Sequence, residues 1–151
     1  MIRLVLYQPD IPQNVGAILR LSACFNMPVD IIEPCGFIWD DKRVKRTAMD
    51  YTDLARVERH RSWETYQRSA NEGRLVLLTT KAAVPYHSFA FSAQDRLIFG
   101  QESAGVPDEV HRAADARIII PMSPAARSLN LAQSAAIASA EALRQTGRFP
   151  Q

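Results

Sequence analysis

The sequence predicts an α/β protein with a mostly parallel sheet and helices on both faces. Short apolar runs typical of buried strands alternate with segments of helical periodicity along the whole chain. A length of 151 residues suits one domain with its own core. No internal repeat or low-complexity linker divides the chain. We therefore expect a single domain over residues 1–151.

The predicted strands are runs rich in β-branched residues and leucine. Proline ends several of them, because it has no N–H to give to a sheet ladder. The run 54–58 is the weakest, and residues 83–93 show no assignable pattern. The expected strands are Ile2–Tyr7, Val29–Glu33, Leu54–Glu58, Arg74–Thr79, Arg96–Phe99 and Arg117–Ile120.

The predicted helices follow residues that favour helix starts. Asn14, Ser62 and Asn130 are typical N-caps, and Gln133 completes a capping box with Asn130. Asp40 and Asp41 suit the start of a short basic helix. The expected helices run from 14 to 25, 42 to 46, 62 to 72, 107 to 114, and from 130 to about 146.

Composition limits the functional classes only loosely. Lys and Arg total 18 against 16 acidic residues, so a net charge of +2 does not by itself indicate a nucleic-acid partner. Cys24 and Cys35 fit no metal or redox spacing, and the three histidines lie far apart. The first apolar run is too short for a signal or membrane segment. We expect a cytoplasmic protein without a metal or a membrane anchor.

Three common nucleotide and hydrolase motifs are missing from the sequence. There is no GxGxxG after the first strand, no P-loop lysine motif and no GxSxG. These absences argue against a dinucleotide-binding Rossmann domain, a P-loop triphosphatase and a serine hydrolase of the nucleophile-elbow type.

Four loops fall where parallel strands are expected to end, which is where ligands bind in such sheets. Each has a plain alternative as a turn or a helix cap, and each alone is weak. Together they combine polar side chains with glycines that permit close backbone approach. The loops contain Asn14 with Arg20, Thr79 with Thr80, Gly100 to Pro107, and Met122 to Asn130.

A basic run lies beside a tryptophan near residue 40. Clustered cations suit contact with phosphates, and an aromatic ring suits stacking on a base. The alternative is a solvated helix capped by Asp40 and Asp41. The RNA-binding candidates in this run are Trp39, Lys42, Arg43, Lys45 and Arg46.

Three motifs in this order resemble the SPOUT class of RNA methyltransferases. They are NVGAILR, IFGQESAGVP and IIIPMSPAARSLNLAQSAA. More closely, LYQPDIPQNVGAILRL, IIEPCGFIWDDKR and MDY are similar to the small tRNA wobble-nucleotide 2′-O-methyltransferases, the TrmL group. The motifs cover both ends and the centre of the chain.

The resemblance implies a fold and a cofactor. Members of the class have a trefoil knot near the C-terminus, bind S-adenosylmethionine and work as homodimers in which the partner completes each active site. Backbone from three loops holds the cofactor. Carried onto this chain, the implied cofactor residues are Leu78, Thr79, Gly100, Glu102, Gly105, Ile120, Met122, Ser128 and Leu129.

The implied reaction is 2′-O-methylation of the tRNA wobble nucleotide, a cytidine or a modified uridine. Arg20 matches the catalytic arginine of the class, and we interpret its guanidinium as a hydrogen-bond donor to the 2′-oxygen or the adjacent phosphate. Four further polar residues match active-site positions and are expected to hold Arg20 and the loops: Asn14, Glu102, Ser128 and Asn130. Arg127 is a further RNA-binding candidate.

Two other interpretations remain open. The same chemistry applies to another tRNA position or to ribosomal RNA. A non-catalytic RNA- or nucleotide-binding module of the same fold is the alternative from a different functional class.

Overall fold

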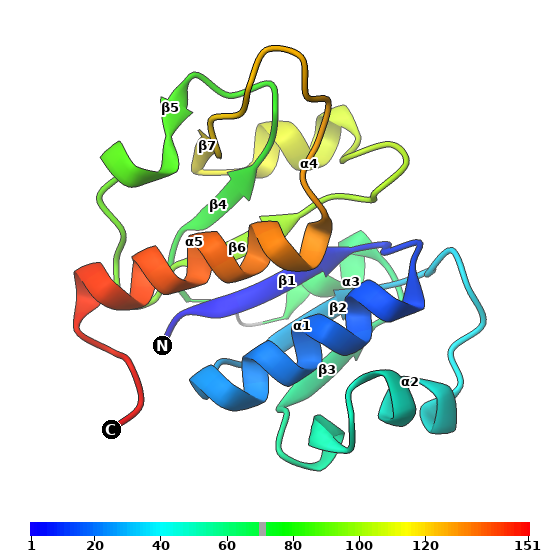
Figure 1. Cartoon of the computed structure of the whole chain (residues 1–151). Helices are drawn as coiled ribbons and strands as arrows, with labels where there is room; N and C mark the ends of the chain where they lie inside the picture. The colour runs from blue at the N-terminus through cyan, green and yellow to red at the C-terminus, as the bar shows by residue number, and fades with distance from the viewer. Residues whose placement is uncertain (70–71) are drawn as a thin grey trace.

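A seven-stranded parallel sheet forms the centre of the computed structural model, which describes residues 1–69 and 72–151 (Figure 1). The strand order is β3-β2-β1-β6-β4-β7-β5, and all six pairings are parallel. The predicted α/β class is confirmed. The strands are β1 (Arg3–Tyr7), β2 (Val29–Ile32), β3 (Val57–His60), β4 (Leu75–Leu78), β5 (Val84–Pro85), β6 (Arg96–Phe99) and β7 (Ala116–Ile119).

Helices cover both faces of this sheet. In Figure 1, α1 and α5 lie across the near face, and α3 and α4 lie behind it. The helices are α1 (Pro12–Phe25), α2 (Asp41–Thr47), α3 (Trp63–Arg68), α4 (Asp108–Ala113) and α5 (Leu131–Thr146), with 3-10 turns η1 (Tyr51–Asp53) and η2 (Tyr86–Ser88). Within the described ranges, every helix is too short or too polar to cross a membrane.

The alternation of side chains along each strand produces two apolar cores, one on each face. On β1, Leu4 and Leu6 pack with α1 and α5, whereas Val5 and Tyr7 pack with Trp63 of α3 and Val110 of α4. Because successive side chains in a strand point to opposite faces, a strand buried on both sides must be apolar throughout. This requirement explains the continuous apolar runs that identified the strands.

The weakest predicted strand begins three residues later than predicted and ends two residues later. We predicted 54–58, but β3 spans Val57–His60 and Leu54 is 71% exposed. The buried imidazole of His60 contacts the buried carboxylate of Asp30, with Nε2 and Oδ1 2.9 Å apart. This contact joins residues 30 positions apart, so a tertiary interaction decides the position of the strand and no local pattern reveals it.

The first helix begins two residues earlier than predicted. Pro12 occupies its first turn and Ile11 is the N-cap residue, without a side-chain cap bond. Proline suits the first helical position, since its missing N–H has no intrahelical partner there in any case. The prediction that Asn14 caps this helix is therefore wrong. Asn14 lies inside the helix, and its side chain is free to bond elsewhere.

Two other caps are confirmed. Asn130 Oδ1 accepts hydrogen bonds from the backbone N–H groups of Ala132 (2.9 Å) and Gln133 (3.2 Å) at the start of α5. Ser62 Oγ accepts one from Thr65 (3.1 Å) at the start of α3. That helix ends at Arg68, short of the predicted 62–72, and residues 70–71 of the predicted span lie outside the described residues.

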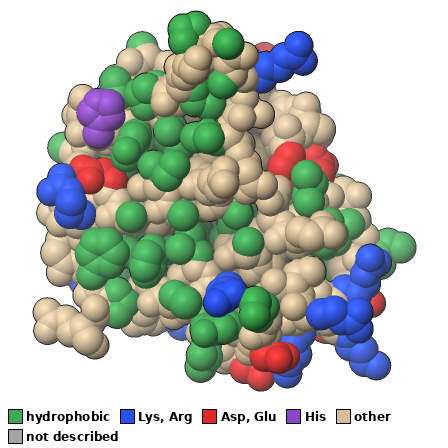
Figure 2. Space-filling view, viewed as in Figure 1, with side chains coloured by type: hydrophobic (Ala, Val, Ile, Leu, Met, Phe, Trp, Pro, Cys, Tyr) green, Lys and Arg blue, Asp and Glu red, His purple; other side chains and the backbone are tan. Residues whose placement is uncertain are grey.

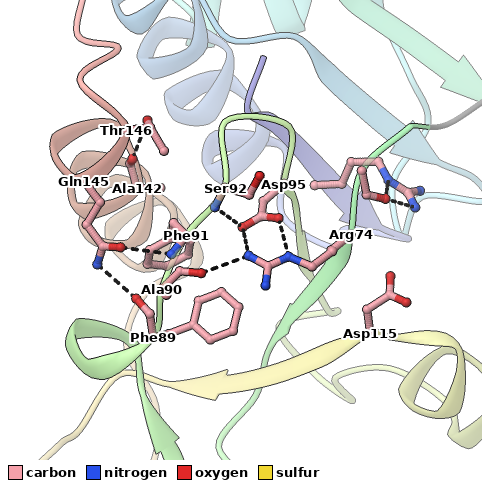
Figure 3. A network of polar contacts seen from close by, with 12 residues as sticks. Arg74, Phe89, Ala90, Phe91, Ser92, Asp95, Asp115, Ala142, Gln145 and Thr146 are labelled. Atoms are coloured by element: carbon pink, nitrogen blue, oxygen red, sulfur yellow. Dashed lines mark hydrogen bonds and ion pairs between the residues drawn. The ribbon is translucent and has the colours of Figure 1, made fainter.

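The unassigned segment 83–93 contains β5 and η2, and a polar network fixes the residues that follow (Figure 3). The side-chain amide of Gln145 on α5 donates to the carbonyl of Phe89 (3.0 Å) and accepts from the N–H of Phe91 (2.9 Å). The buried carboxylate of Asp95 forms a bidentate pair with Arg74 (2.9 and 2.8 Å). These partners are distant in sequence, which is why the segment carried no local pattern.

After β7 the polypeptide returns across β4 toward the centre of the sheet. β7 lies beyond β4, but α5 packs against α1 and β6 on the other side of β4. Residues 120–130 must therefore pass over the carboxyl ends of the central strands, as the orange segment in Figure 1 does. This path is consistent with the trefoil knot that the resemblance implies, and the knot itself stays a prediction.

Candidate active site

A cavity of about 460 Å³ lies at the carboxyl ends of β4, β6 and β7. β4 lies between the other two in the sheet, so the loops that follow these three strands meet at one edge. The volume is within the range of small-molecule sites. All nine residues predicted to hold the cofactor line this cavity: Leu78, Thr79, Gly100, Glu102, Gly105, Ile120, Met122, Ser128 and Leu129.

Two backbone hydrogen bonds close the loop after β6, and two glycines make this closure possible. Gln101 and Gly105 exchange two backbone hydrogen bonds, each 2.9 Å long. A Cβ on Gly100 would lie 2.5 Å from the carbonyl carbon of Gly105, and Gly105 has a φ of +65°. Only residues without a side chain allow this close approach and this left-handed conformation at low cost. The loop consequently forms part of the cavity wall with its backbone.

A continuous polar chain joins three of the predicted site residues. Glu102 Oε1 accepts a hydrogen bond from Asn14 Nδ2 (3.2 Å), and Asn14 Oδ1 accepts one from Asn130 Nδ2 (2.9 Å). Asn14 is buried, with 7% of its surface exposed. The start of α1, the loop after β6 and the start of α5 are thus held in a fixed arrangement around the cavity.

Asp10 extends this polar chain of hydrogen bonds, although its role was not predicted from the sequence. Its backbone N–H donates to Glu102 Oε2 (2.8 Å), and its Oδ2 accepts from the N–H (3.1 Å) and the hydroxyl (2.5 Å) of Ser103. The only signal in the sequence was an acidic residue in the loop that also contains Asn14. Its partners lie more than 90 residues away, so the pairing needed the fold.

Arg20 lies apart from this polar chain. Its Nη1 lies 2.7 Å from Met49 Sδ, and its guanidinium stacks 5.3 Å from the centre of the Tyr51 ring. The expectation that the polar set holds Arg20 is therefore wrong within one chain. Six helical positions separate Arg20 from Asn14, a rotation of about 120° around the axis, so the two side chains point in different directions. Arg20 is exposed and does not line the cavity of its own chain.

The cavity walls combine apolar and basic groups. Leu77, Leu78, Ile119 and Ile120 line it from the ends of β4 and β7. Two cations line it as well, and one of them, Arg127, was predicted to contact RNA. The other is Lys81, and His111 also lines the cavity. Neither residue was predicted, because an isolated lysine or histidine carries no distinguishing local pattern.

The basic run forms α2, and all four of its cations are exposed. Figure 2 shows Lys and Arg side chains gathered on this part of the surface, at the lower right. Asp40 caps the helix by accepting from the N–H groups of Lys42 (2.9 Å) and Arg43 (3.4 Å). Lys45 pairs with Asp53 at 3.3 Å. The capping that belongs to the alternative of a solvated helix is thus seen for Asp40, whereas Asp41 lies in the first turn. The four cations stay exposed, and RNA contact stays a prediction.

Trp39 is held by its neighbours. Its ring lies 6.2 Å from that of Phe37, the guanidinium of Arg59 is 4.5 Å from its centre, and its Nε1 donates to Asp41 (2.7 Å). These contacts fix the loop that leads into α2. Stacking of Trp39 on a base stays a prediction.

One group of side chains outside the cavity has metal-ligand character. Asp30, Glu58 and His60 bring ligand atoms within 4.8 Å of one another. The Arg3 guanidinium already pairs with both carboxylates of this group, since its Nη1 lies 2.8 Å from both oxygens of Asp30 and 3.9 Å from Glu58 Oε2. The cluster is an ion-pair network that links β1, β2 and β3.

Curated relatives match nearly the whole chain. The tRNA (cytidine(34)-2′-O)-methyltransferase of Beijerinckia indica is 51% identical over 146 residues, which cover 95% of this chain and 91% of that protein. The enzyme with the same name in Escherichia coli K12 is 40% identical over 149 residues, 97% of this chain and 95% of that protein.

Solved structures match the fold. The structure described as "Structural insights into the 2-OH methylation of C/U34 on tRNA" has a TM-score of 0.90 and 35% identity, covering 96% of this chain and 95% of that one. An rRNA methyltransferase from Sinorhizobium meliloti with bound AdoMet has a TM-score of 0.84 and 26% identity, over 95% of this chain and 56% of that one. The model of the SpoU rRNA methylase family matches residues 1–140, so the chain belongs to this family.

Proposed function

We propose that the protein transfers a methyl group from S-adenosylmethionine to the ribose 2′-oxygen of tRNA nucleotide 34, a cytidine or a uridine. The observation that carries this proposal is the 51% identity to a tRNA (cytidine(34)-2′-O)-methyltransferase over nearly the whole of both chains. The cavity supports it independently, since all nine residues inferred for the cofactor line one space.

The cavity fits a nucleoside cofactor in its chemistry as well as its size. Apolar side chains at the ends of β4 and β7 offer walls to a base, and the closed loop from Gly100 to Gly105 offers backbone groups to polar atoms. When bound, S-adenosylmethionine supplies an electrophilic methyl group on a positively charged sulfur. The residues that would hold it are the nine named above, with Asn14 and Asn130 fixing the loops that carry them.

The protein's own contribution to the reaction is alignment and stabilisation of charge. Asn14, Glu102 and Asn130 hold the loops of the cavity in a fixed arrangement, so the cavity would hold the methyl donor in one orientation relative to the attacking oxygen. The 2′-hydroxyl loses its proton as it attacks, and we assign Arg20 to stabilise the developing negative charge on that oxygen. A guanidinium remains protonated, so a substrate phosphate or water accepts the proton.

Arg20 reaches the reacting oxygen only if a second copy of the chain supplies it. It is exposed and lies outside the cavity of its own chain. Two apolar side chains at the cavity, Ile11 (41% exposed) and Leu129 (37%), are exposed in the single chain. A two-fold pairing that covers these residues would bring α1 of one copy to the cavity of the other. We therefore propose a homodimer with a shared active site that works in the cytoplasm, without a metal.

The tRNA surface that we propose consists of α2 and the loop after β7. The cations are Lys42, Arg43, Lys45, Arg46 and Arg127. Exposed lysines and arginines bind phosphates through charge, which positions the anticodon stem without reading its sequence.

The decisive experiment is methyl transfer from labelled S-adenosylmethionine to a transcribed tRNA that has cytidine at position 34. We expect one 2′-O-methylcytidine per tRNA after nuclease digestion and mass spectrometry. The matched control is the same tRNA with 2′-deoxycytidine at position 34, which must remain unmethylated. Methylation of the deoxy control, or of another nucleotide, would contradict the proposed site. Binding of tRNA without any methylation of cytidine- or uridine-34 substrates would favour a non-catalytic module.

A further inference from the structure

His111 on α4 carries a buried donor that has no partner in the folded chain. Its Nε2 is shielded from water and forms no hydrogen bond with the described residues, yet the residue lines the cavity. A buried N–H without a partner destabilises the folded protein. A ligand atom that accepts this hydrogen bond would remove this destabilisation.

Arg117 on β7 determines which ring nitrogen of His111 carries the proton. Arg117 Nε lies 3.0 Å from His111 Nδ1, and Arg117 Nη2 also donates to the backbone carbonyl of His111. An arginine N–H can only donate, so Nδ1 must accept and the proton lies on Nε2. Two contacts from one guanidinium thus fix both the tautomer and the orientation of the imidazole.

The cavity wall on the α4 side of the sheet, from which His111 comes, includes several apolar side chains. Ile118 belongs to the core on the α5 side, so its neighbour Ile119 points to the opposite face. Leu77 belongs to the α4-side core, and Val106 packs against it. Three apolar residues of the α4 side line the cavity together with His111: Leu77, Val106 and Ile119. An unpartnered N–H beside this apolar wall suits a flat ligand with apolar faces and a lone pair at its edge.

We propose that His111 binds the adenosine part of the methyl donor, with Nε2–H donating to an acceptor atom of this part. A purine nucleoside has the required apolar faces and acceptor atoms. By contrast, the amino-acid end of the cofactor is charged and would lose its hydration against Leu77 and Ile119. This inference rests on the proposed function for the identity of the ligand. It adds a cofactor-binding residue outside the loops that the sequence motifs identify.

The test is calorimetric binding of two probes, S-adenosylhomocysteine and 5′-methylthioadenosine, which lacks the amino-acid end. We expect His111→Leu to weaken the binding of both probes by about 5- to 20-fold, the loss of one buried hydrogen bond. His111→Gln keeps a side-chain N–H near the position of Nε2 and should stay within about 3-fold of the original protein. Unchanged affinity for both probes in His111→Leu would overturn the inference. Weakened binding of S-adenosylhomocysteine alone would also overturn it.

Nitrogen NMR of the imidazole gives a second readout that does not depend on affinity. In the free protein we expect a protonated Nε2 and an unprotonated Nδ1, and the Nε2–H resonance should shift on addition of S-adenosylhomocysteine. An unshifted resonance in a saturated sample would contradict the contact. Thermal unfolding of both variants separates a local effect from misfolding. If the original protein binds neither probe, the cofactor assignment fails, whereas normal binding with no effect of His111→Leu refutes only the role of His111.

Discussion

Asn14 and Asn130 lie 116 positions apart, and their side chains are joined by a 2.9 Å hydrogen bond. The same Asn14 amide donates to Glu102, so one buried side chain connects the starts of α1 and α5 with the loop after β6. The Nδ2 group of Asn14 donates to Glu102, and its Oδ1 accepts from Asn130. No other side chain of this size has an N–H donor and a carbonyl acceptor on the same group.

Replacing Asn14 should destabilise the fold and the cavity together. Asn14→Ala removes one hydrogen bond from Glu102 and one from Asn130, and it should lower the free energy of unfolding by about 1–3 kcal/mol. Asn14→Asp is nearly isosteric but places a second carboxylate beside Glu102, so we expect a loss at least as large. Urea unfolding measures both. Gln13→Ala is the control on the same helix, since Gln13 is exposed. Equal effects at positions 13 and 14 would show that the polar chain does not matter.

The two glycines of the β6 loop should respond differently to alanine. At Gly100 a Cβ would lie 2.5 Å from the Gly105 backbone, so Gly100→Ala must open the loop. We expect a loss of S-adenosylhomocysteine affinity of at least about tenfold, because the cavity wall moves. At Gly105 a Cβ meets nothing within 4 Å, and only the φ of +65° opposes it. Gly105→Ala should therefore cost about 1 kcal/mol of stability and little affinity. A larger affinity loss at Gly105 than at Gly100 would be inconsistent with this geometry.

Arg20 should act in the active site of the partner. Arg20→Ala should lower kcat by about 10²–10³-fold and leave the Kd of S-adenosylhomocysteine unchanged. Arg20→Lys should recover little, because an ammonium cannot reproduce the planar donors. A heterodimer of Arg20→Ala with the cofactor-blocked Gly100→Ala, purified through two tags, should keep about half of the activity of the original dimer, since one site retains both parts. An inactive heterodimer built from folded subunits would mean that Arg20 acts within its own chain.

The thiol of Cys35 should react slowly in the folded protein. Burial, reinforced by the charge of Glu33, raises the pKa of Cys35 to about 11 from its ordinary value of 9.0. Because the thiolate is the nucleophile, folded Cys35 in a Cys24→Ser background should react with iodoacetamide about a hundredfold more slowly at pH 8 than the same residue unfolded in urea. The folded state holds this proton more tightly than the unfolded state, so stability should fall as the pH rises from about 9 to 11. Equal labelling rates in the folded and unfolded protein would contradict the burial of this thiol.

The cations of α2 should account for part of the salt dependence of tRNA binding. Lys42→Gln with Arg46→Gln should weaken tRNA binding and reduce the slope of log K against log salt by about one for each lost phosphate contact. Arg68→Gln is the matched control, an exposed arginine on α3 behind the sheet. Filter binding between 50 and 200 mM salt (a range of about fourfold) measures the slopes. A similar change with Arg68→Gln would argue against a localised surface.

The parts of this fold that depend on local chemistry were predictable from the sequence. Buried parallel strands need continuous apolar runs, and Asn130 begins α5 through its own side chain, so both could be identified without coordinates. The position of β3 depends on Asp30 and His60, and the segment after β4 depends on Gln145 and Asp95. These interactions cross long stretches of chain and leave no periodicity.

The candidate site also has features that the local sequence predicts and features that depend on the fold. Its loops were found because glycine, proline and asparagine have strong conformational preferences, and the class resemblance supplied the residues that line the cavity. The direction of Arg20, the role of Asp10 and the orphan donor of His111 depend on how distant segments pack. A sequence shows which residues are present in such a site, but their pairing is a property of the fold.

Because distant parts of the chain line the cavity, the cavity also determines when during synthesis the protein can first bind its cofactor. The walls include Ile11 near one end of the chain and Ser134 in the second turn of α5 near the other. During synthesis the cavity is therefore incomplete until α5 has left the ribosome and docked against α1 and β6. The nascent chain cannot bind the methyl donor tightly before that point, and binding by ribosome-stalled chains of increasing length would report the docking of α5 directly.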